Sequence, residues 1–125
     1  MSGPTVSTGV DVIEIARIAR SLERFGSRFL NRIYTEGEQR HCRGRPNELA
    51  VRFAAKEAAS KALGTGMRGL RWRDIEVLVD PRGKPQLRLH GPAAAHAAAA
   101  GLASFALSLS HSREFAIAVV VALGP

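Results

Sequence analysis

The segment from Glu48 to Leu63 constrains the fold of this chain more than any other. It reads ELAVRFAAKEAASKAL, and Asn47 before it and Gly64 after it are typical residues at the two ends of a helix. Alanine fills rows along two sides of this helix, at positions 54, 58 and 62 and at positions 55 and 59. Small side chains let neighbouring elements approach a helix closely. We therefore expect a central helix that is packed on several sides.

The rest of the chain predicts a mixture of short helices and strands. Valines and a threonine alternate with small or polar residues over 5–12, which predicts a strand, and apolar residues recur at helical spacing over 14–25. Thr35 and Glu38 form a capping-box pattern, which predicts the start of another helix. Further elements are expected as helices at 27–32, from 36 to about 42 and from 92 to about 101, and as strands at 74–79, 85–90, 104–110 and 115–122. This order predicts a single α+β domain over 1–125 with mainly antiparallel pairing.

The charge of the chain points to anionic partners. The 18 basic and 11 acidic residues give a formal net charge of +7, and because only Lys56, Lys61 and Lys84 are lysines, 15 of the basic residues are arginines. The planar guanidinium group binds phosphates and carboxylates. A nucleic acid, an anionic membrane, a phosphorylated cofactor and an acidic protein all fit this charge. Composition alone does not choose among them.

Other features narrow the class of protein. A single cysteine, Cys42, excludes an internal disulfide framework and a multi-cysteine metal site. The N-terminus lacks the pattern of a secretory signal, and the alanine-rich stretch 93–109 is too weakly apolar for a membrane span. We therefore expect a cytoplasmic protein with no membrane partner. Oligomerisation would add useful burial to a chain of 125 residues.

Glu57 and Lys61 on the central helix are the first candidate site residues. They are four residues apart and share a face, so the simplest interpretation is a surface ion pair that contributes about 0.3–0.5 kcal/mol. Phe53 lies on the same face, and the alanine rows predict that the helix is closely surrounded. These two features favour a functional role for the pair.

Asp11 is the second candidate. It lies near the end of the first predicted strand, on the face opposite the valines. It is interpreted either as the N-cap of the following helix or as a metal ligand. Mg²⁺ takes one or two carboxylates and completes its shell with water and substrate phosphates, so Asp11 and Glu57 together would suit it.

Turns supply the remaining candidates. His111 lies at the predicted turn between the last two strands, where a histidine is usually a plain surface residue. The turns at Gly64-Thr65-Gly66 and Arg82-Gly83-Lys84-Pro85 are most simply a helix end and a hairpin. Either turn could offer backbone N–H groups to a phosphate, although a Walker loop is absent.

Several segments, taken together and in order, resemble the holo-acyl-carrier-protein synthase family, the small phosphopantetheinyl transferases. The resemblance rests on G-x-D near the N-terminus, R-x-A-A-K-E-A-x-x-K-A in the middle and S-x-S-H near the end. The segments that carry it are 9–18, 29–38, 52–66, 72–77, 83–89 and 108–111. The stretch 67–71 is shorter than is common in the family, where it lies close to the cofactor.

The resemblance implies a mainly antiparallel sheet wrapped around a long central helix. It also implies a homotrimer whose active sites lie between neighbouring subunits. The reaction that the resemblance implies is the Mg²⁺-dependent transfer of 4′-phosphopantetheine from coenzyme A to a serine of apo acyl carrier protein, with release of adenosine 3′,5′-bisphosphate. The carrier protein would serve fatty-acid or polyketide synthesis.

The resemblance also assigns roles to individual residues. Asp11 and Glu57 match the metal ligands, and Lys61 matches a lysine near the pyrophosphate; these three are the expected catalytic residues. With Lys61, the positions expected to bind coenzyme A are Arg52, Gly64, Gly83, Lys84, Pro85 and His111. Arg17 and Arg24 match basic positions that dock the acidic recognition helix of the carrier protein. The acceptor of the serine proton is either Glu57 or a metal-bound water.

Two other functions compete with this one. The arginine content suggests a basic nucleic-acid-binding protein without catalytic activity. Aromatic residues make up only 6% of the chain, and the sequence carries no RNP, KH or zinc-finger pattern, so we expect no nucleic-acid partner. A non-catalytic module that binds carrier proteins is the second alternative, but Asp11, Glu57 and Lys61 are all present.

Overall fold

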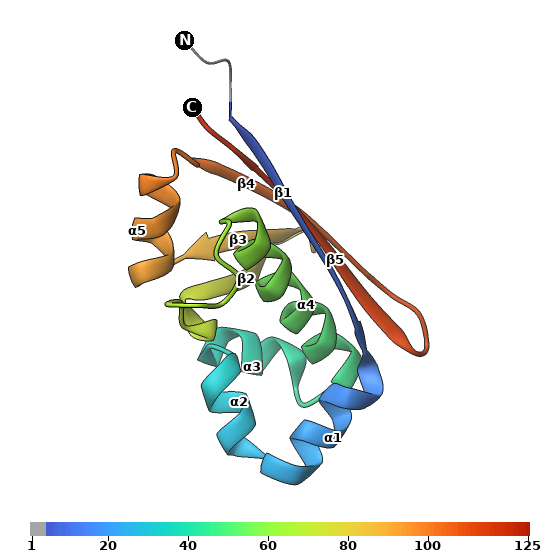
Figure 1. The fold of residues 1–125 in the computed structure, drawn as a ribbon. Helices are drawn as coiled ribbons and strands as arrows, with labels where there is room; N and C mark the ends of the chain where they lie inside the picture. The colour runs from blue at the N-terminus through green and yellow to red at the C-terminus, as the bar shows by residue number, and fades with distance from the viewer. Residues whose placement is uncertain (1–4) are drawn as a thin grey trace.

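The computed structural model describes residues 5–125. Strands and helices follow one another as β1 (Val6–Glu14), α1 (Ile15–Phe25), α2 (Ser27–Ile33), α3 (Glu36–Cys42), α4 (Pro46–Ala62), the short 3₁₀ turn η1 (Trp72–Asp74), β2 (Ile75–Val79), β3 (Pro85–Leu89), α5 (Gly91–Ala99), β4 (Ser104–His111) and β5 (Phe115–Leu123) (Figure 1). This order confirms the predicted elements. No helix within the described residues is both long and apolar enough to cross a bilayer.

All strand pairs are antiparallel. β1, β5 and β4 form a three-stranded sheet in that order, and β2 pairs with β3 in a separate hairpin. Helix α4 packs against β1 and β5 on one side and contacts β2, α1 and α3 on others. Figure 1 shows α4 between the long sheet and the β2–β3 hairpin, with α1 to α3 gathered at one end. The α+β fold around a long central helix is therefore as predicted.

The close packing predicted for α4 is with strand β1. Alanines 54, 55, 58, 59 and 62 of α4 are buried. Gly9 of β1 lies so close to α4 that a Cβ atom there would be only 1.8 Å from the carbonyl oxygen of Ala58. The Ser7 hydroxyl donates a hydrogen bond of 2.6 Å to the carbonyl oxygen of Ala62. Because side chains alternate along a strand, Asp11 lies on the same face of β1 as Ser7 and Gly9.

The predicted start of the central helix is wrong, and one of the two interpretations of Asp11 is excluded. α4 begins at Pro46 rather than Glu48, with Arg45 as its N-cap, and Asn47 lies inside the helix. Proline is favoured in the first turn because its φ is already helical and its missing N–H is not needed there. Asp11 does not cap α1, because β1 continues to Glu14, which is the N-cap residue of that helix.

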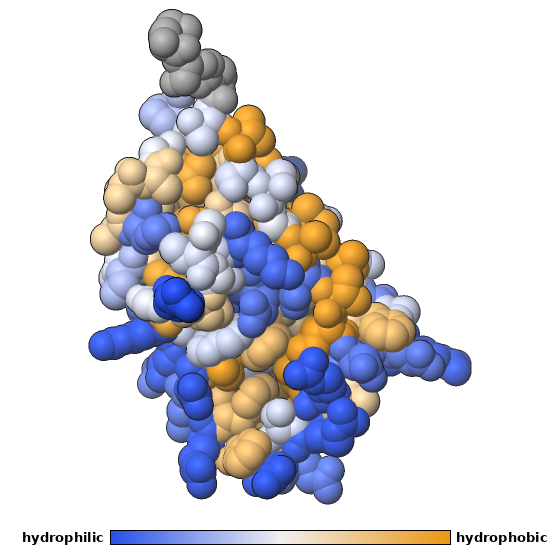
Figure 2. Space-filling view, in the orientation of Figure 1, coloured by the Kyte–Doolittle hydropathy of each residue, from blue (hydrophilic) through white to orange (hydrophobic). Residues whose placement is uncertain are grey.

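The valine face of β1 points away from α4 into solvent. Val6, Val10 and Val12 are 50–60% exposed. Across the sheet, Val10 is paired with Val119 and Val12 with Ile117, so the apolar surface continues onto β5. Figure 2 shows apolar side chains as a band along β1. A continuous exposed apolar surface of this kind is typical of an interface.

Replacing Gly9 with alanine should destabilise the fold. The added methyl group would force β1 away from α4, and overpacking of this kind costs about 2–3 kcal/mol of unfolding free energy. Chemical denaturation measures the change. Gly37→Ala is the matched control, because a Cβ at that helical position has no neighbour closer than 3.6 Å. The free energy of unfolding of this control should rise by up to about 1 kcal/mol. Equal effects of the two changes would contradict the predicted contact.

Candidate active site

Asp11 and Lys61 meet where β1 crosses the last turn of α4. The Lys61 ammonium donates hydrogen bonds to the carbonyl oxygen of Val10, at 2.9 Å, and to Asp11 Oδ1, at 3.3 Å. The simple surface pair between Lys61 and Glu57 is therefore not what forms, because the nearby strand offers Lys61 two acceptors. Half of the Lys61 side chain remains exposed, so its ammonium can still reach a ligand.

Glu57 belongs to the same cluster. Partial burial raises the pKa of its carboxyl group above the usual value, and the Asp11 carboxylate raises it further, while Lys61 acts in the opposite direction. Asp11 and Glu57 are thus close enough to repel each other. Such repulsion favours a cation between them.

The donor set of this cluster suits Mg²⁺. Among residues 5–125 there is no group of three or more histidine, cysteine or acidic side chains placed to hold a metal ion. Asp11 and Glu57 therefore offer two hard carboxylates and leave the other coordination positions to water or to a ligand. This is the arrangement in which Mg²⁺ usually binds together with phosphates.

A second group of predicted residues lines a hollow of about 470 Å³. The hollow lies between the first turns of α4, the β2–β3 turn and strand β4. Arg52, Gly83, Lys84, Pro85 and His111, which the resemblance assigns to coenzyme A, all line it. Their side chains and backbone make the hollow suited to an anionic ligand.

Arg52 is the most deeply placed cation of this hollow, with 3% of its surface exposed. Its Nη1 donates to the Glu48 carboxylate at 3.1 Å, whereas its buried Nε has no hydrogen-bond partner within the described part of the chain. Asn47, which does not cap α4, lies with its amide nitrogen 3.5 Å from Nε2 of His111. His41 also lines the hollow, and burial, followed by the charge of Arg52, lowers the pKa of its imidazole.

The two groups lie on different faces of α4. Arg52 and Glu57 are five residues apart, which separates them by about 140° around the helix axis. None of Asp11, Glu57 and Lys61 lines the 470 Å³ hollow. Gly64 follows α4 with a left-handed backbone (φ 88°) and does not line that hollow either. Within one chain, the predicted residues therefore form two half-sites: a carboxylate half-site and a hollow half-site.

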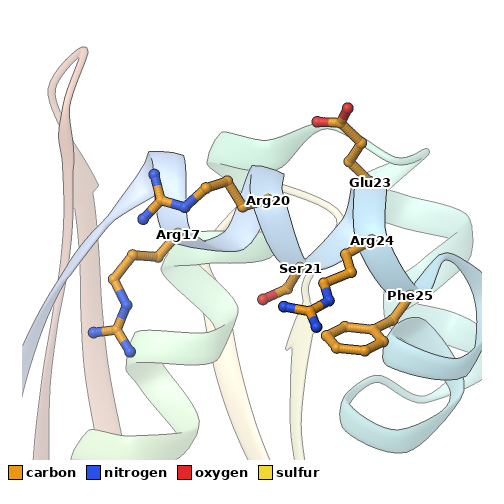
Figure 3. A pocket seen from close by; sticks show the side chains of 6 residues that line it. All are labelled: Arg17, Arg20, Ser21, Glu23, Arg24 and Phe25. Carbon is orange, nitrogen blue, oxygen red and sulfur yellow. The ribbon is translucent and has the colours of Figure 1, made fainter.

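Helix α1 carries a basic surface. Arg17, Arg20 and Arg24 line a shallow hollow of about 600 Å³ with Phe25. In Figure 3, Arg24 and Phe25 lie on the same side of the helix, and the Glu23 carboxylate points away from them. The Arg24 guanidinium lies 5.2 Å from the centre of the Phe25 ring. Both predicted docking residues, Arg17 and Arg24, are therefore on this surface.

A buried ion pair was not anticipated from the sequence. The Lys56 ammonium is fully buried and donates to Glu38 Oε1 at 2.8 Å and to the carbonyl oxygens of Trp72 and Ile75. Glu38, expected only as part of a capping box, also accepts a hydrogen bond from the backbone N–H of Val77. The sequence did hold a sign of this pair. Lys56 lies in the middle of a helix lined with alanine, where a buried lysine needs an acidic partner.

Cys42 belongs to neither half-site. It is buried, and burial raises the pKa of its thiol to about 11. The thiol is therefore protonated at neutral pH and unreactive. Cys42 is therefore a structural residue of the core.

Comparisons with known proteins give a family for the whole chain. The family model of the 4′-phosphopantetheinyl transferase superfamily matches residues 7–120. The holo-[acyl-carrier-protein] synthase of Herpetosiphon aurantiacus is 50% identical over 124 residues, which cover 94% of this chain and 98% of the relative. The synthase of Koribacter versatilis is 49% identical over 120 residues, with coverage of 93% and 96%. The crystal structure of the Helicobacter pylori synthase in complex with coenzyme A superposes with a TM-score of 0.84 at 35% identity, covering 92% of this chain and 98% of that one.

Glu57→Gln should stabilise the metal-free protein at neutral pH. The folded state raises the pKa of Glu57, so ionisation of this group costs folding free energy as the pH rises from the usual glutamate value through the raised one. Glutamine removes this cost. We expect the melting temperature to rise by about 1–3 °C at pH 7.5 and to match that of the unchanged protein near pH 4.

Thermal melts in chelator-containing buffer measure this difference. Glu114→Gln, at an exposed turn, is the matched control for the loss of one carboxylate. A melting temperature that falls in Glu57→Gln at pH 7.5 would show that Glu57 stabilises the fold instead of straining it.

Proposed function

This chain belongs to the 4′-phosphopantetheinyl transferase superfamily, and we infer that it transfers 4′-phosphopantetheine from coenzyme A to a serine of apo acyl carrier protein. The relatives that bear the name holo-[acyl-carrier-protein] synthase match it over more than nine-tenths of its length. The observation that carries the proposal is the cluster of Asp11, Glu57 and Lys61, since its two carboxylates and one ammonium suit phosphoryl transfer.

In this reaction the serine oxygen attacks the β-phosphorus of coenzyme A, and the bond to the bridging oxygen breaks. Adenosine 3′,5′-bisphosphate leaves, and the serine loses its proton. We propose Glu57 as the acceptor of that proton, because it is the carboxylate of this cluster that is not paired with Lys61. Lys61, half exposed beside Asp11, would stabilise the charge that develops on the leaving bisphosphate.

Asp11 and Glu57 are the residues that we propose to hold Mg²⁺. When bound, the cation would neutralise the pyrophosphate oxygens and orient them for the attack. The repulsion between the two carboxylates supports this assignment, because a cation relieves it.

The hollow half-site is the proposed place for the nucleotide part of coenzyme A. Arg52, Lys84 and His111 supply cations and hydrogen-bond donors for phosphates, and the Gly83–Pro85 turn adds backbone groups. Within residues 5–125 the buried Nε of Arg52 has no hydrogen-bond partner, which supports this role, since a phosphate would satisfy it. Gly64 is proposed to contact coenzyme A at the end of α4, near Lys61.

We also propose that the chain acts as a homotrimer. The two half-sites face different directions, so a complete site needs the carboxylate half-site of one subunit and the hollow half-site of a neighbour. The exposed apolar surface of β1 and β5 supports this assembly, because burial between subunits would remove it from water. Arg17 and Arg24 on α1 are proposed to dock the acidic recognition helix of the carrier protein.

Mass spectrometry of a carrier protein tests the reaction. Apo acyl carrier protein incubated with this protein, coenzyme A and Mg²⁺ should gain the mass of one phosphopantetheine group on its serine. Glu57→Gln should lower kcat by about 10²–10³-fold, because it removes both a charge and a base. Glu36→Gln, an exposed change on α3, is the control and should keep normal turnover.

Two results would count against the proposal. Normal turnover by Glu57→Gln would remove Glu57 from the catalytic group. No transfer at all, combined with salt-sensitive binding to DNA or RNA, would favour a nucleic-acid-binding protein.

A further inference from the structure

Three hollows join into one groove on the surface of the molecule. The α1 hollow shares Ser21 and Phe25 with a second hollow of about 450 Å³, which extends over α2. The second hollow shares Arg32 and Trp72 with a third of about 810 Å³, which is bordered by Met67 to Asp74. The groove therefore runs from the proposed docking helix to the segment that connects α4 with β2. We call the residues 67–73 of this segment the connecting segment.

Apolar side chains form the floor of the groove. Phe25 and Phe29 contribute from α1 and α2, and Met67 and Leu70 contribute from the connecting segment. Trp72 lies between these two ends and stacks on Phe53, with ring centres 4.6 Å apart. The floor is thus held in place by contact with the central helix.

Cations line the edges of the groove. Arg28 and Arg32 border it on α2, and Arg71 and Arg73 border it on the connecting segment. These arginines outnumber the acidic lining residues, which are Glu23 and Asp74. Within residues 5–125 none of these four guanidinium groups forms an ion pair. Arg73 donates a hydrogen bond of 3.2 Å to the carbonyl oxygen of Asn31, which ties the connecting segment to α2. An apolar floor with cationic edges fits an amphipathic segment whose polar side is acidic.

We propose that Arg71 and Arg73 form a second docking contact for the acyl carrier protein, which binds an acidic segment other than the one held by Arg17 and Arg24. This inference rests on the proposed function, which supplies the protein substrate. Two observations support the proposal. The groove is continuous with the α1 hollow, and among residues 5–125 its four bordering arginines form no ion pair. The hollow half-site proposed for the nucleotide part of coenzyme A shares no lining residue with the groove.

The contact should act mainly on encounter with the carrier protein. Exposed arginines attract carboxylates over several ångströms, which raises the association rate and makes it sensitive to salt. Reversing the charge of Arg71 and Arg73 should therefore raise KM for the carrier protein and leave KM for coenzyme A unchanged. Both side chains are exposed, and the one side-chain hydrogen bond that is lost within residues 5–125 is that from Arg73 to Asn31, so a thermal melt of the variant should show an intact fold.

Steady-state transfer kinetics of the double variant Arg71→Glu/Arg73→Glu test the proposal. We expect KM for apo carrier protein to rise at least about fivefold, and its dependence on salt to become weaker, because two attractive contacts become repulsive. The matched control Arg40→Glu/Arg88→Glu makes the same change in net charge at exposed positions outside the groove and should shift KM less than twofold. The KM of Arg71→Gln/Arg73→Gln for the carrier protein should lie between the values of the double glutamate variant and of the control.

Several outcomes would overturn the proposal while leaving the proposed function intact. Transfer with an unchanged KM for the carrier protein would show that the connecting segment makes no contact. An equal rise in the control would show a general effect of net charge. A rise in KM for coenzyme A alone would assign the connecting segment to the cofactor, and loss of RNA binding without any change in KM would assign it to a nucleic acid. Absence of transfer by the unchanged protein would instead reject the proposed function itself.

Discussion

The contact between Gly9 and Ala58 is the constraint on which the rest of the structure depends. No side chain fits between β1 and α4 at this point, so strand and helix cross with their backbones nearly touching. Two residues further along β1, Asp11 reaches the end of α4, where Lys61 holds it. The same contact turns Val6, Val10 and Val12 outward. One close approach thus sets up both the carboxylate half-site and the apolar surface proposed to join subunits.

Helix α4 connects every part of the proposed site. Its alanines pack against the sheet, and Lys56 anchors its other side to α3 and β2 through Glu38. A buried ion pair of this kind adds little net stability, but the loss of one partner leaves a buried charge that costs about 3–5 kcal/mol. The pair therefore keeps α4 in one position between its neighbours. This matters because Arg52 and Glu57, which belong to different half-sites, are held by the same helix.

Local patterns in the sequence predicted most of the fold, and distant contacts account for what they missed. The capping box at Thr35 and Glu38, the alanine rows and the strand alternations are short-range signals, and the structure confirms them. The pairing of Lys61 with Asp11 instead of Glu57 was missed, because it joins residues 50 positions apart. The burial of Lys56 was missed for the same reason, because its partners lie on α3 and β2. The roles of Asp11, Glu57 and Lys61 came from a resemblance, since no spacing along one strand and one helix identifies a metal site.

The two half-sites on different faces of α4 are proposed to combine between subunits. The activity of assemblies that mix two variants tests this proposal most directly. Subunits with Glu57→Gln and subunits with Arg52→Gln, co-expressed with different affinity tags, should each be inactive alone. When both are present in equal amounts, about one quarter of the interfaces join two intact half-sites, so about one quarter of the activity should return. Activity of the mixed assemblies no higher than the average of the two variants would contradict a shared site.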